Sequence, residues 1–178
     1  MEFPVCTFDL KTGVLCSSCE EKVRRGEISS LDVEIMRFIL ELERRMPYLA
    51  SLNYVKSVKV DDYLFLVLRE RSLSALEQDK QAEVRRVLSE RFRLKVELVE
   101  DSRDLNKFIQ NLVHPARVLA VNKMWLPDQS TEIRVIIDEE RKLRAPLNIL
   151  AQVVKMFKGL SMSFESQRKR PSGSRSAR

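Results

Sequence analysis

Histidine is almost missing from the 178-residue chain, which contains a single one, His114. Glycine and cysteine are also scarce, with four and three residues. One histidine, no Ser/His/Asp spacing and no cluster of metal-ligating carboxylates argue against catalysis. The few glycines are too scattered to form a loop that cradles a phosphate. The sequence therefore predicts that the protein is not an enzyme.

Long apolar runs are absent as well. The longest, residues 63–68, is much shorter than the about 20 residues that a membrane-spanning helix needs. Residues 1–4 contain no basic stretch leading into an apolar one, so we expect no secretory signal. The remaining composition is that of a globular protein, with 44% hydrophobic and 33% charged residues. We therefore expect a folded, cytoplasmic protein with no membrane partner.

The net charge of +6 is unevenly distributed. Residues 1–29 carry four basic and five acidic side chains, and residues 30–100 carry equal numbers of both. Residues 101–166 have a small basic excess, whereas residues 167–178 carry five basic side chains and no acidic one. This tail is rich in Ser and Arg and has no apolar periodicity, so it is predicted to be disordered. Positive charge available to a nucleic acid is therefore concentrated in the tail.

The first 29 residues hold all three cysteines. Two short β-prone runs, 5–10 and 14–16, flank a turn at Gly13 and predict a small hairpin. A short helix over 20–25 is expected to end at Gly26. The segment is therefore expected to be a cysteine-bearing hairpin followed by one helix.

Cys16 and Cys19 form a Cys-x-x-Cys motif, which places two thiolates at a separation that suits one tetrahedral metal ion. Cys6, on the other arm of the expected hairpin, can face the same point. Zinc would stabilise a segment that is too small to hold a core of its own. The fourth ligand stays open between His114 and a carboxylate such as Asp9. A Cys16–Cys19 disulfide or free thiols are the alternatives to a zinc site at Cys6, Cys16 and Cys19.

Residues 30–100 have the pattern of a small α/β module. Ser29 and Ser30 are good N-cap residues, and apolar residues then recur at spacings of three and four until Pro47. An apolar run and an alternating run on either side of a tight turn predict a β-hairpin. The expected elements are a helix over 31–46, strands over 54–60 and 63–68, helices over 73–77 and 82–92, and a strand over 94–99.

Residues 101–166 repeat this order, which is a signal of duplicated supersecondary structure. A helix that ends before Pro115 is followed by two strand-like runs, a helix pair interrupted near Pro146 and a closing strand. Pro127 to Ser130 supply turn residues between the two runs. The expected elements are a helix over 105–112, strands over 117–126 and 132–137, helices over 139–144 and 147–157, and a strand over 160–164.

Three stretches of sequence carry a family resemblance. Between the two modules, KVELVE at 95–100 precedes a helix with FIQNL at 108–112, and PARVL follows at 115–119. The other stretches are CTFDLKTGVLCSSC at 6–19 and WLPDQSTE at 125–132. Together they resemble tandem KH-domain proteins of the archaeal NusA-like transcription factor family, in a subgroup with a cysteine leader. The resemblance covers about residues 3–166.

This resemblance implies an α+β fold with two tandem type II KH modules of order α-β-β-α-α-β. It also implies single-stranded RNA as a ligand and a role in transcription elongation or termination with RNA polymerase, or with the ribosome in coupled translation. The predicted parts are the cysteine segment 1–29, modules 30–100 and 101–166, and the tail 167–178. The alternative is that degenerate modules serve as a protein–protein docking surface for RNA polymerase or the ribosome.

The chain departs from the KH pattern at the loop that holds RNA. A KH domain clamps the nucleotide backbone with a Gly-x-x-Gly loop, where glycine permits a close approach of the phosphates. Alignment places DKQA at 79–82 and APLN at 145–148 in this loop, and neither stretch contains glycine. Asp79 would also repel a phosphate, and Pro146 lacks a backbone donor. RNA binding at these two loops is therefore expected to be weakened.

The expected RNA contacts are one aromatic and several basic side chains. Trp125, Lys123 and Arg134 can stack on and grip a base on one face of a hairpin, unless Trp125 belongs to the core or to a partner contact. Lys142 and Arg144 can meet phosphates, unless they line a solvated helix face. The tail can contact phosphates without folded geometry, or serve only as a solubilising segment. The complete predicted set is Lys80, Lys123, Trp125, Arg134, Lys142, Arg144, Arg168, Lys169, Arg170, Arg175 and Arg178.

Overall fold

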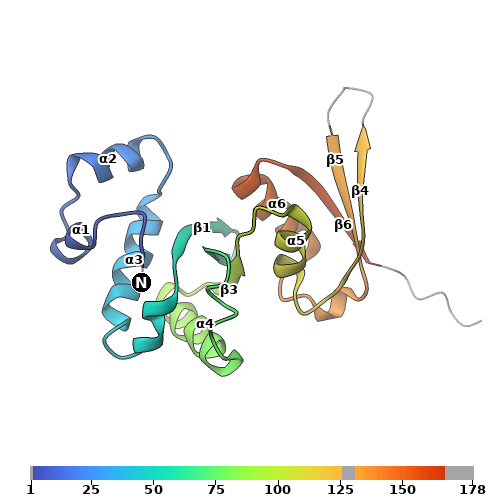
Figure 1. Ribbon diagram of the computed structural model, residues 1–178. Coiled ribbons are helices and arrows are strands. Elements are labelled where there is room, and N and C mark those ends of the chain that lie inside the picture. Colours follow the sequence, from blue (N-terminus) through green and yellow to red (C-terminus); the bar gives the residue numbers. More distant parts are fainter. Residues whose placement is uncertain (1, 126–130, 167–178) are drawn as a thin grey trace, which may run out of the picture. The chain divides into compact units, whose positions relative to one another are not determined.

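The structure, a computed structural model, describes residues 2–125 and 131–166 (Figure 1). The chain divides into two compact units, Met1–Leu112 and Val113–Arg178. The predicted turn at 127–130 and the predicted disordered tail at 167–178 lie outside the described residues. Among the described helices, none combines the length and apolar character that crossing a bilayer requires.

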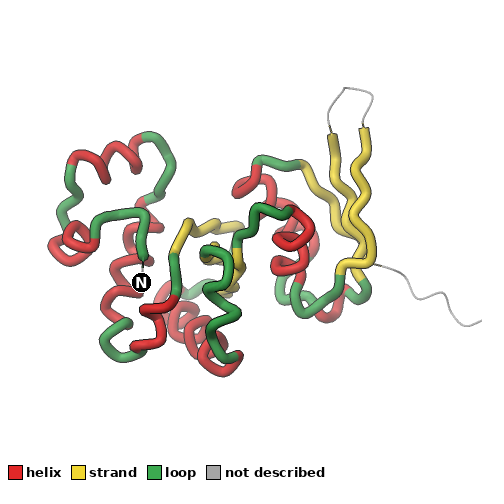
Figure 2. The backbone as a smooth tube through the Cα atoms, in the orientation of Figure 1, coloured by secondary structure: helices red, strands yellow, loops and turns green. Residues whose placement is uncertain are grey.

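The described residues have an α+β architecture with six α-helices, two 3-10 helices and two three-stranded sheets (Figure 2). The α-helices are α1 (Thr7–Thr12), α2 (Ser17–Arg24), α3 (Ser30–Leu42), α4 (Gln78–Phe92), α5 (Leu105–Val113) and α6 (Leu147–Lys158). The 3-10 helices are η1 (Pro47–Ser51) and η2 (Glu140–Lys142). The strands are β1 (Tyr54–Val60), β2 (Tyr63–Leu68), β3 (Lys95–Glu100), β4 (Val118–Trp125), β5 (Thr131–Ile137) and β6 (Ser161–Ser166).

Both sheets have the same topology. Their strand orders are β1-β2-β3 and β4-β5-β6, and in each the first pair is antiparallel and the second pair parallel. A parallel pair needs a crossover, which α4 and α6 supply at equivalent positions. The register of each first strand also shifts near its start, between Tyr54 and Lys56 in β1 and between Val118 and Ala120 in β4. The predicted repeat of element order is confirmed for the strands and for the crossover helices.

In each predicted helix pair, the first helix is wrong. Residues 73–77 form turns instead of a helix, and residues 139–144 contain only η2. Such short segments form no stable helix alone, because the few hydrogen bonds they can make do not offset the conformational entropy lost when a helix is nucleated. In the first case side chains satisfy the backbone instead. Glu100 Oε1 accepts hydrogen bonds from the amides of Leu73 and Ser74, and Gln81 Nε2 donates to the Leu73 and Leu76 carbonyls.

Helix α3 begins where the sequence predicts, in a capping box of Ser29 and Asp32. The Asp32 carboxylate is buried and also accepts hydrogen bonds from the Tyr54 hydroxyl and from the amide and hydroxyl of Ser57 on β1. Burial alone would raise the pKa of Asp32, but the hydrogen bonds from Tyr54, Ser57 and Ser29 outweigh it and hold the pKa below 3.8. One carboxylate therefore ties the start of α3 to the first strand.

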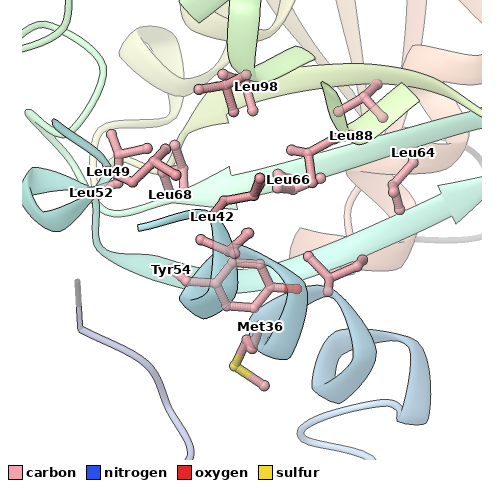
Figure 3. Packing of buried hydrophobic residues seen from close by; sticks show 14 of the residues in the cluster. Met36, Leu42, Leu49, Leu52, Tyr54, Leu64, Leu66, Leu68, Leu88 and Leu98 are labelled. Carbon is pink, nitrogen blue, oxygen red and sulfur yellow. The ribbon is translucent and has the colours of Figure 1, made fainter. Parts of the chain in front are cut away.

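The core of the first unit lies against one face of its sheet (Figure 3). Leu64, Leu66 and Leu68 lie on the face of β2 that is turned toward this core, and each is at most 1% exposed. Phe65 and Val67 on the opposite face are also only 1% exposed, so β2 is buried on both faces. Residues of α3 and α4, such as Met36 and Leu88, belong to the same cluster. The cysteine segment adds Val5, Leu10, Cys19 and Ile28 to it. The segment therefore shares the core of the module. The sequence by itself suggests a segment without a core, which zinc would have to stabilise.

The predicted N-terminal hairpin is wrong, because the segment is helical. Residues 7–12 form α1, and Gly13 ends it in the left-handed conformation at φ 85°, with its amide donating to the Asp9 carbonyl. The turn at Gly13 was predicted, but it caps a helix. Burial of Val5 and Leu10 in the shared core explains the difference, since this contact is not encoded in the local pattern. The helix expected before Gly26 is confirmed as α2, which starts earlier, at Ser17.

Candidate metal centre

Two helix starts bring four potential metal ligands together. Cys6 is the N-cap of α1 and Asp9 lies in its first turn, while Cys16 is the N-cap of α2 and Cys19 lies in its first turn. One ligand atom of each residue, three sulfurs and a carboxylate oxygen, lies within 4.8 Å of all the others. The amide of Cys16 donates a 3.0 Å hydrogen bond to Asp9 Oδ2 and so connects the two helix starts directly.

The cluster has a buried and an accessible side. Cys19 and Asp9 are 2% and 3% exposed, whereas Cys6 and Cys16 are exposed. Several contacts position the cluster. Helix α1 packs against α3, Arg37 Nε of α3 donates to the Leu10 carbonyl at 3.3 Å, and Lys22 Nζ of α2 donates to the Pro4 carbonyl at 2.8 Å. The site is therefore anchored on the module rather than carried on a free loop.

The pKa values of the two buried ligand candidates, Asp9 and Cys19, are shifted in opposite directions. The amide of Cys16, followed by the thiols of Cys19 and Cys16, lowers the pKa of Asp9 by hydrogen bonding to its carboxylate. Burial raises the pKa of Cys19 to about 12, and the neighbouring carboxylate adds to this effect. Without a cation, Cys19 is therefore a neutral thiol that donates to Asp9. A metal ion that binds here takes the place of thiol protons.

The spacing of the four donor atoms is compatible with one metal ion. Zinc–sulfur bonds of about 2.3 Å place neighbouring sulfurs of a tetrahedral site about 3.8 Å apart. The cluster, with its donor atoms within 4.8 Å of one another, reaches that geometry by a contraction of about 1 Å or less. Cys6, Asp9, Cys16 and Cys19 can therefore hold a metal ion, as predicted for the three cysteines.

The structure also bears on the alternatives for this segment. All three cysteines are free thiols, so the Cys16–Cys19 disulfide is not formed. Asp9 is the carboxylate that joins the sulfurs. A sequence signal for Asp9 exists, since Cys6-x-x-Asp9 has the spacing of Cys16-x-x-Cys19. It becomes informative only once both stretches are known to start helices.

Gly13 ends α1 between the two ligand pairs, and its replacement by alanine is expected to lower the free energy of unfolding by about 2 kcal/mol. An alanine there has a left-handed φ, and its Cβ would lie 2.3 Å from Arg37 Nη2, so the guanidinium that donates to the Leu10 carbonyl would have to move. Gly26→Ala is the matched control, because Gly26 also has a positive φ, of 73°, but no atom within 4 Å of a Cβ. Gly26→Ala should lower the free energy of unfolding by about 1 kcal/mol. Urea unfolding measures both, and equal losses would contradict a role for the Arg37 contact.

The predicted base-gripping trio does not lie on one face of its sheet. Lys123 and Trp125 are two residues apart on β4 and share a face, with the Lys123 ammonium 4.9 Å from the Trp125 ring centroid. Arg134 pairs with Asn122, so it lies on the opposite face, where it forms an ion pair with Glu165 at 3.3 Å. Trp125 is 73% exposed and is not a core residue. Lys123 and Trp125 therefore form a pair without Arg134.

The other predicted RNA contacts that the structure describes lie in ion-paired or exposed positions. Lys80 is inside α4, where it pairs with Glu77 at 3.0 Å, so the stretch 79–82 is helical and forms no loop. Lys142 in η2 pairs with Asp138 at 2.8 Å, and Arg144 is exposed shortly before α6. Arg168, Lys169, Arg170, Arg175 and Arg178 lie outside the described residues.

Comparison with known proteins gives a similarity of fold. No protein-family model and no curated protein matches the chain. Among solved structures, the crystal structure of APE1850 is similar with a TM-score of 0.53 and 15% sequence identity. The match covers 74% of this chain and 96% of APE1850. At this identity the similarity concerns the fold alone.

Proposed function

We propose that the protein is an RNA-associated factor of the NusA-like type, with two KH-like modules that act with RNA polymerase in transcription elongation or termination, or with the ribosome. The observation that carries this proposal is the repeat. Both sheets share strand order, pairing directions, an early register shift in the first strand and a crossover helix. The resemblance of the sequence to tandem KH proteins of this family supports the same function.

In this proposal the modules act as a scaffold more than as clamps. The segments that lead into α4 and α6 contain no glycine, and residues 79–82 are already helical. Backbone approach to phosphates is therefore restricted at both positions. The exposed pair of Lys123 and Trp125 offers a ring on which a base can stack. The basic tail supplies sequence-independent affinity through phosphate contacts.

Replacing the five basic residues of the tail with glutamine in the full-length chain is expected to weaken binding to single-stranded RNA and to flatten its salt dependence. Each lost phosphate contact removes about 0.7 from the slope of log K against log salt, so the slope should fall by up to about 3.5. Fluorescence anisotropy with a labelled oligonucleotide at several salt concentrations measures it. Unchanged affinity and slope would contradict a role for the tail, and Trp125→Ala then tests base stacking independently.

A docking function is the second candidate, and exposed apolar side chains favour it. Phe8 and Val14 lie beside the metal-ligand candidates and are 73% and 72% exposed. Exposed hydrophobic side chains such as these can contribute to contact with a partner. Affinity purification with and without nuclease separates the two functions. Polymerase or ribosome that co-purifies only without nuclease supports RNA association, and co-purification that resists nuclease supports docking.

We propose Zn²⁺ as the ion of the candidate metal centre. The three cysteine thiolates form a donor set that suits zinc, whereas magnesium and calcium prefer oxygen ligands. Bound zinc would hold the starts of α1 and α2 together in a structural role. Native mass spectrometry of protein prepared without chelator tests the proposal. A mass that corresponds to the metal-free chain would contradict it.

A further inference from the structure

We propose that Asp9 is the fourth protein ligand of this metal and fills the position of a fourth cysteine, with its carboxylate completing a Cys3Asp site. The inference rests on the proposed zinc site and identifies the residue that closes it. His114 and an external ligand such as water are the competing candidates for the fourth position. Three independent features of the described residues favour Asp9.

The first feature is a repeated local geometry. In α2 the N-cap residue Cys16 and the first-turn residue Cys19 are three positions apart. In α1 the N-cap residue Cys6 and the first-turn residue Asp9 have the same spacing and the same two helix positions. The two helix starts therefore present equivalent ligand pairs to one point, and Asp9 occupies in the first pair the place of Cys19 in the second.

The second feature is a buried carboxyl group without an ion-pair partner. Asp9 is 3% exposed, so its carboxyl group is withdrawn from water. No lysine or arginine in the part of the chain that the structure describes forms an ion pair with it; its partners are the amide of Cys16 and the thiols of Cys16 and Cys19. Buried charges in proteins are normally paired or coordinate a metal. A divalent cation among the four donors supplies the missing positive charge.

The third feature is the orientation of the carboxylate. The 3.0 Å hydrogen bond from the Cys16 amide engages Oδ2 and fixes the side chain with an oxygen within 4.8 Å of all three sulfurs. A second partner that orients a metal-binding carboxylate is typical of metal sites. Each thiol that becomes a thiolate ligand of the bound divalent ion releases its proton to solvent. The product has three metal–sulfur bonds and one metal–oxygen bond.

The test uses Co²⁺ as a spectroscopic substitute for zinc in the full-length protein. Co²⁺ in a tetrahedral site has strong visible d–d bands, and each thiolate adds charge-transfer absorption in the near ultraviolet. We compare the wild-type chain with Asp9→Asn, Asp9→Cys and Glu20→Gln. Glu20→Gln is the matched control, because Glu20 is an exposed carboxylate in the first turn of α2 and is not part of the cluster.

Wild-type protein and Glu20→Gln are expected to give the same tetrahedral spectrum with three thiolates. Asp9→Asn should shift the d–d bands and weaken Co²⁺ and Zn²⁺ binding by 10-fold or more, judged by competition with a chromophoric chelator. Asp9→Cys should restore tight binding and raise the charge-transfer absorption by about one third, because four thiolates replace three. This gain in signal does not depend on the stability of the asparagine variant.

Identical spectra and affinities of Asp9→Asn and Glu20→Gln would overturn the assignment of Asp9 and leave the three-cysteine zinc site standing. A wild-type protein that binds neither Co²⁺ nor Zn²⁺ would instead overturn the proposed zinc site, and the assignment with it. Far-UV circular dichroism of each variant shows that the chain is folded before these spectra are compared.

Discussion

Replacing Asp32 with alanine is expected to lower the free energy of unfolding by about 4 kcal/mol. The carboxylate accepts hydrogen bonds from Ser29, Tyr54 and Ser57, and its removal leaves the buried Tyr54 hydroxyl and the Ser57 amide without an acceptor at about 2 kcal/mol each. Denaturant unfolding of the full-length chain measures the loss. Asp79→Ala is the control, because Asp79 also lies in the first turn of a helix but is exposed. A loss no greater than that of the control would contradict the role of Asp32.

The same residue predicts a pH dependence. The pKa of Asp32 is lowered in the folded chain relative to 3.8, so the ionised carboxylate stabilises the fold. This contribution is complete above the unfolded value and is lost as pH falls from about 4 through the lowered folded pKa. Asp32→Asn keeps the side-chain shape and removes the charge. The stability difference between wild type and Asp32→Asn should therefore be constant near pH 7 and shrink in acid, and a difference that grows in acid would contradict this assignment.

Loss of the proposed zinc site is the second change with a large expected effect. Cys19→Ser should reduce zinc affinity by more than 100-fold, because it deletes a thiolate ligand that is buried between the two helix starts. The rest of the first module should stay folded, since most of its core residues come from α3, α4 and the sheet. Hydrogen exchange should therefore increase in residues 6–25 and change little in β1 to β3.

Chelation of the proposed zinc ion from the wild-type protein should give the same local pattern of exchange as Cys19→Ser. Ser18→Ala, at the exposed neighbouring position in α2, is the control and should retain the metal. If chelation instead unfolded the whole first unit, the N-terminal segment would be essential to the module's core rather than attached to it. If exchange in 6–25 did not change, the metal would have no structural role.

The best sequence predictions rested on local chemistry. Ser29 and Asp32 form a capping box at the predicted start of α3, and the hairpin of β1 and β2 turns at Asp61, which has a left-handed φ of 49°. The interactions behind these elements join residues within a few positions of one another, so a single stretch of sequence contains them. The repeat could be predicted for the same reason, since each strand and crossover helix has its own pattern.

The failed predictions concern short segments whose conformation depends on distant residues. The run at 5–10 is β-prone, but Val5 and Leu10 pack into a core formed by α3 and the sheet, and the segment is helical. The sequence of 73–77 predicts a helix, but its first two amides donate hydrogen bonds to the Glu100 carboxylate and the segment does not become helical. Segments of five or six residues have too small an intrinsic preference to resist such contacts.

For the metal centre, the sequence by itself determined that two cysteines can share an ion, because Cys16-x-x-Cys19 needs only one turn of chain. Only the tertiary structure decided that Cys6 and Asp9 join them, and that Arg134 and Trp125 lie on opposite faces of a strand pair. The physical reason is the same in both cases. Which side chains meet across two helix starts or two strands depends on how whole elements pack and align, and that information is spread over the chain rather than contained in any one motif.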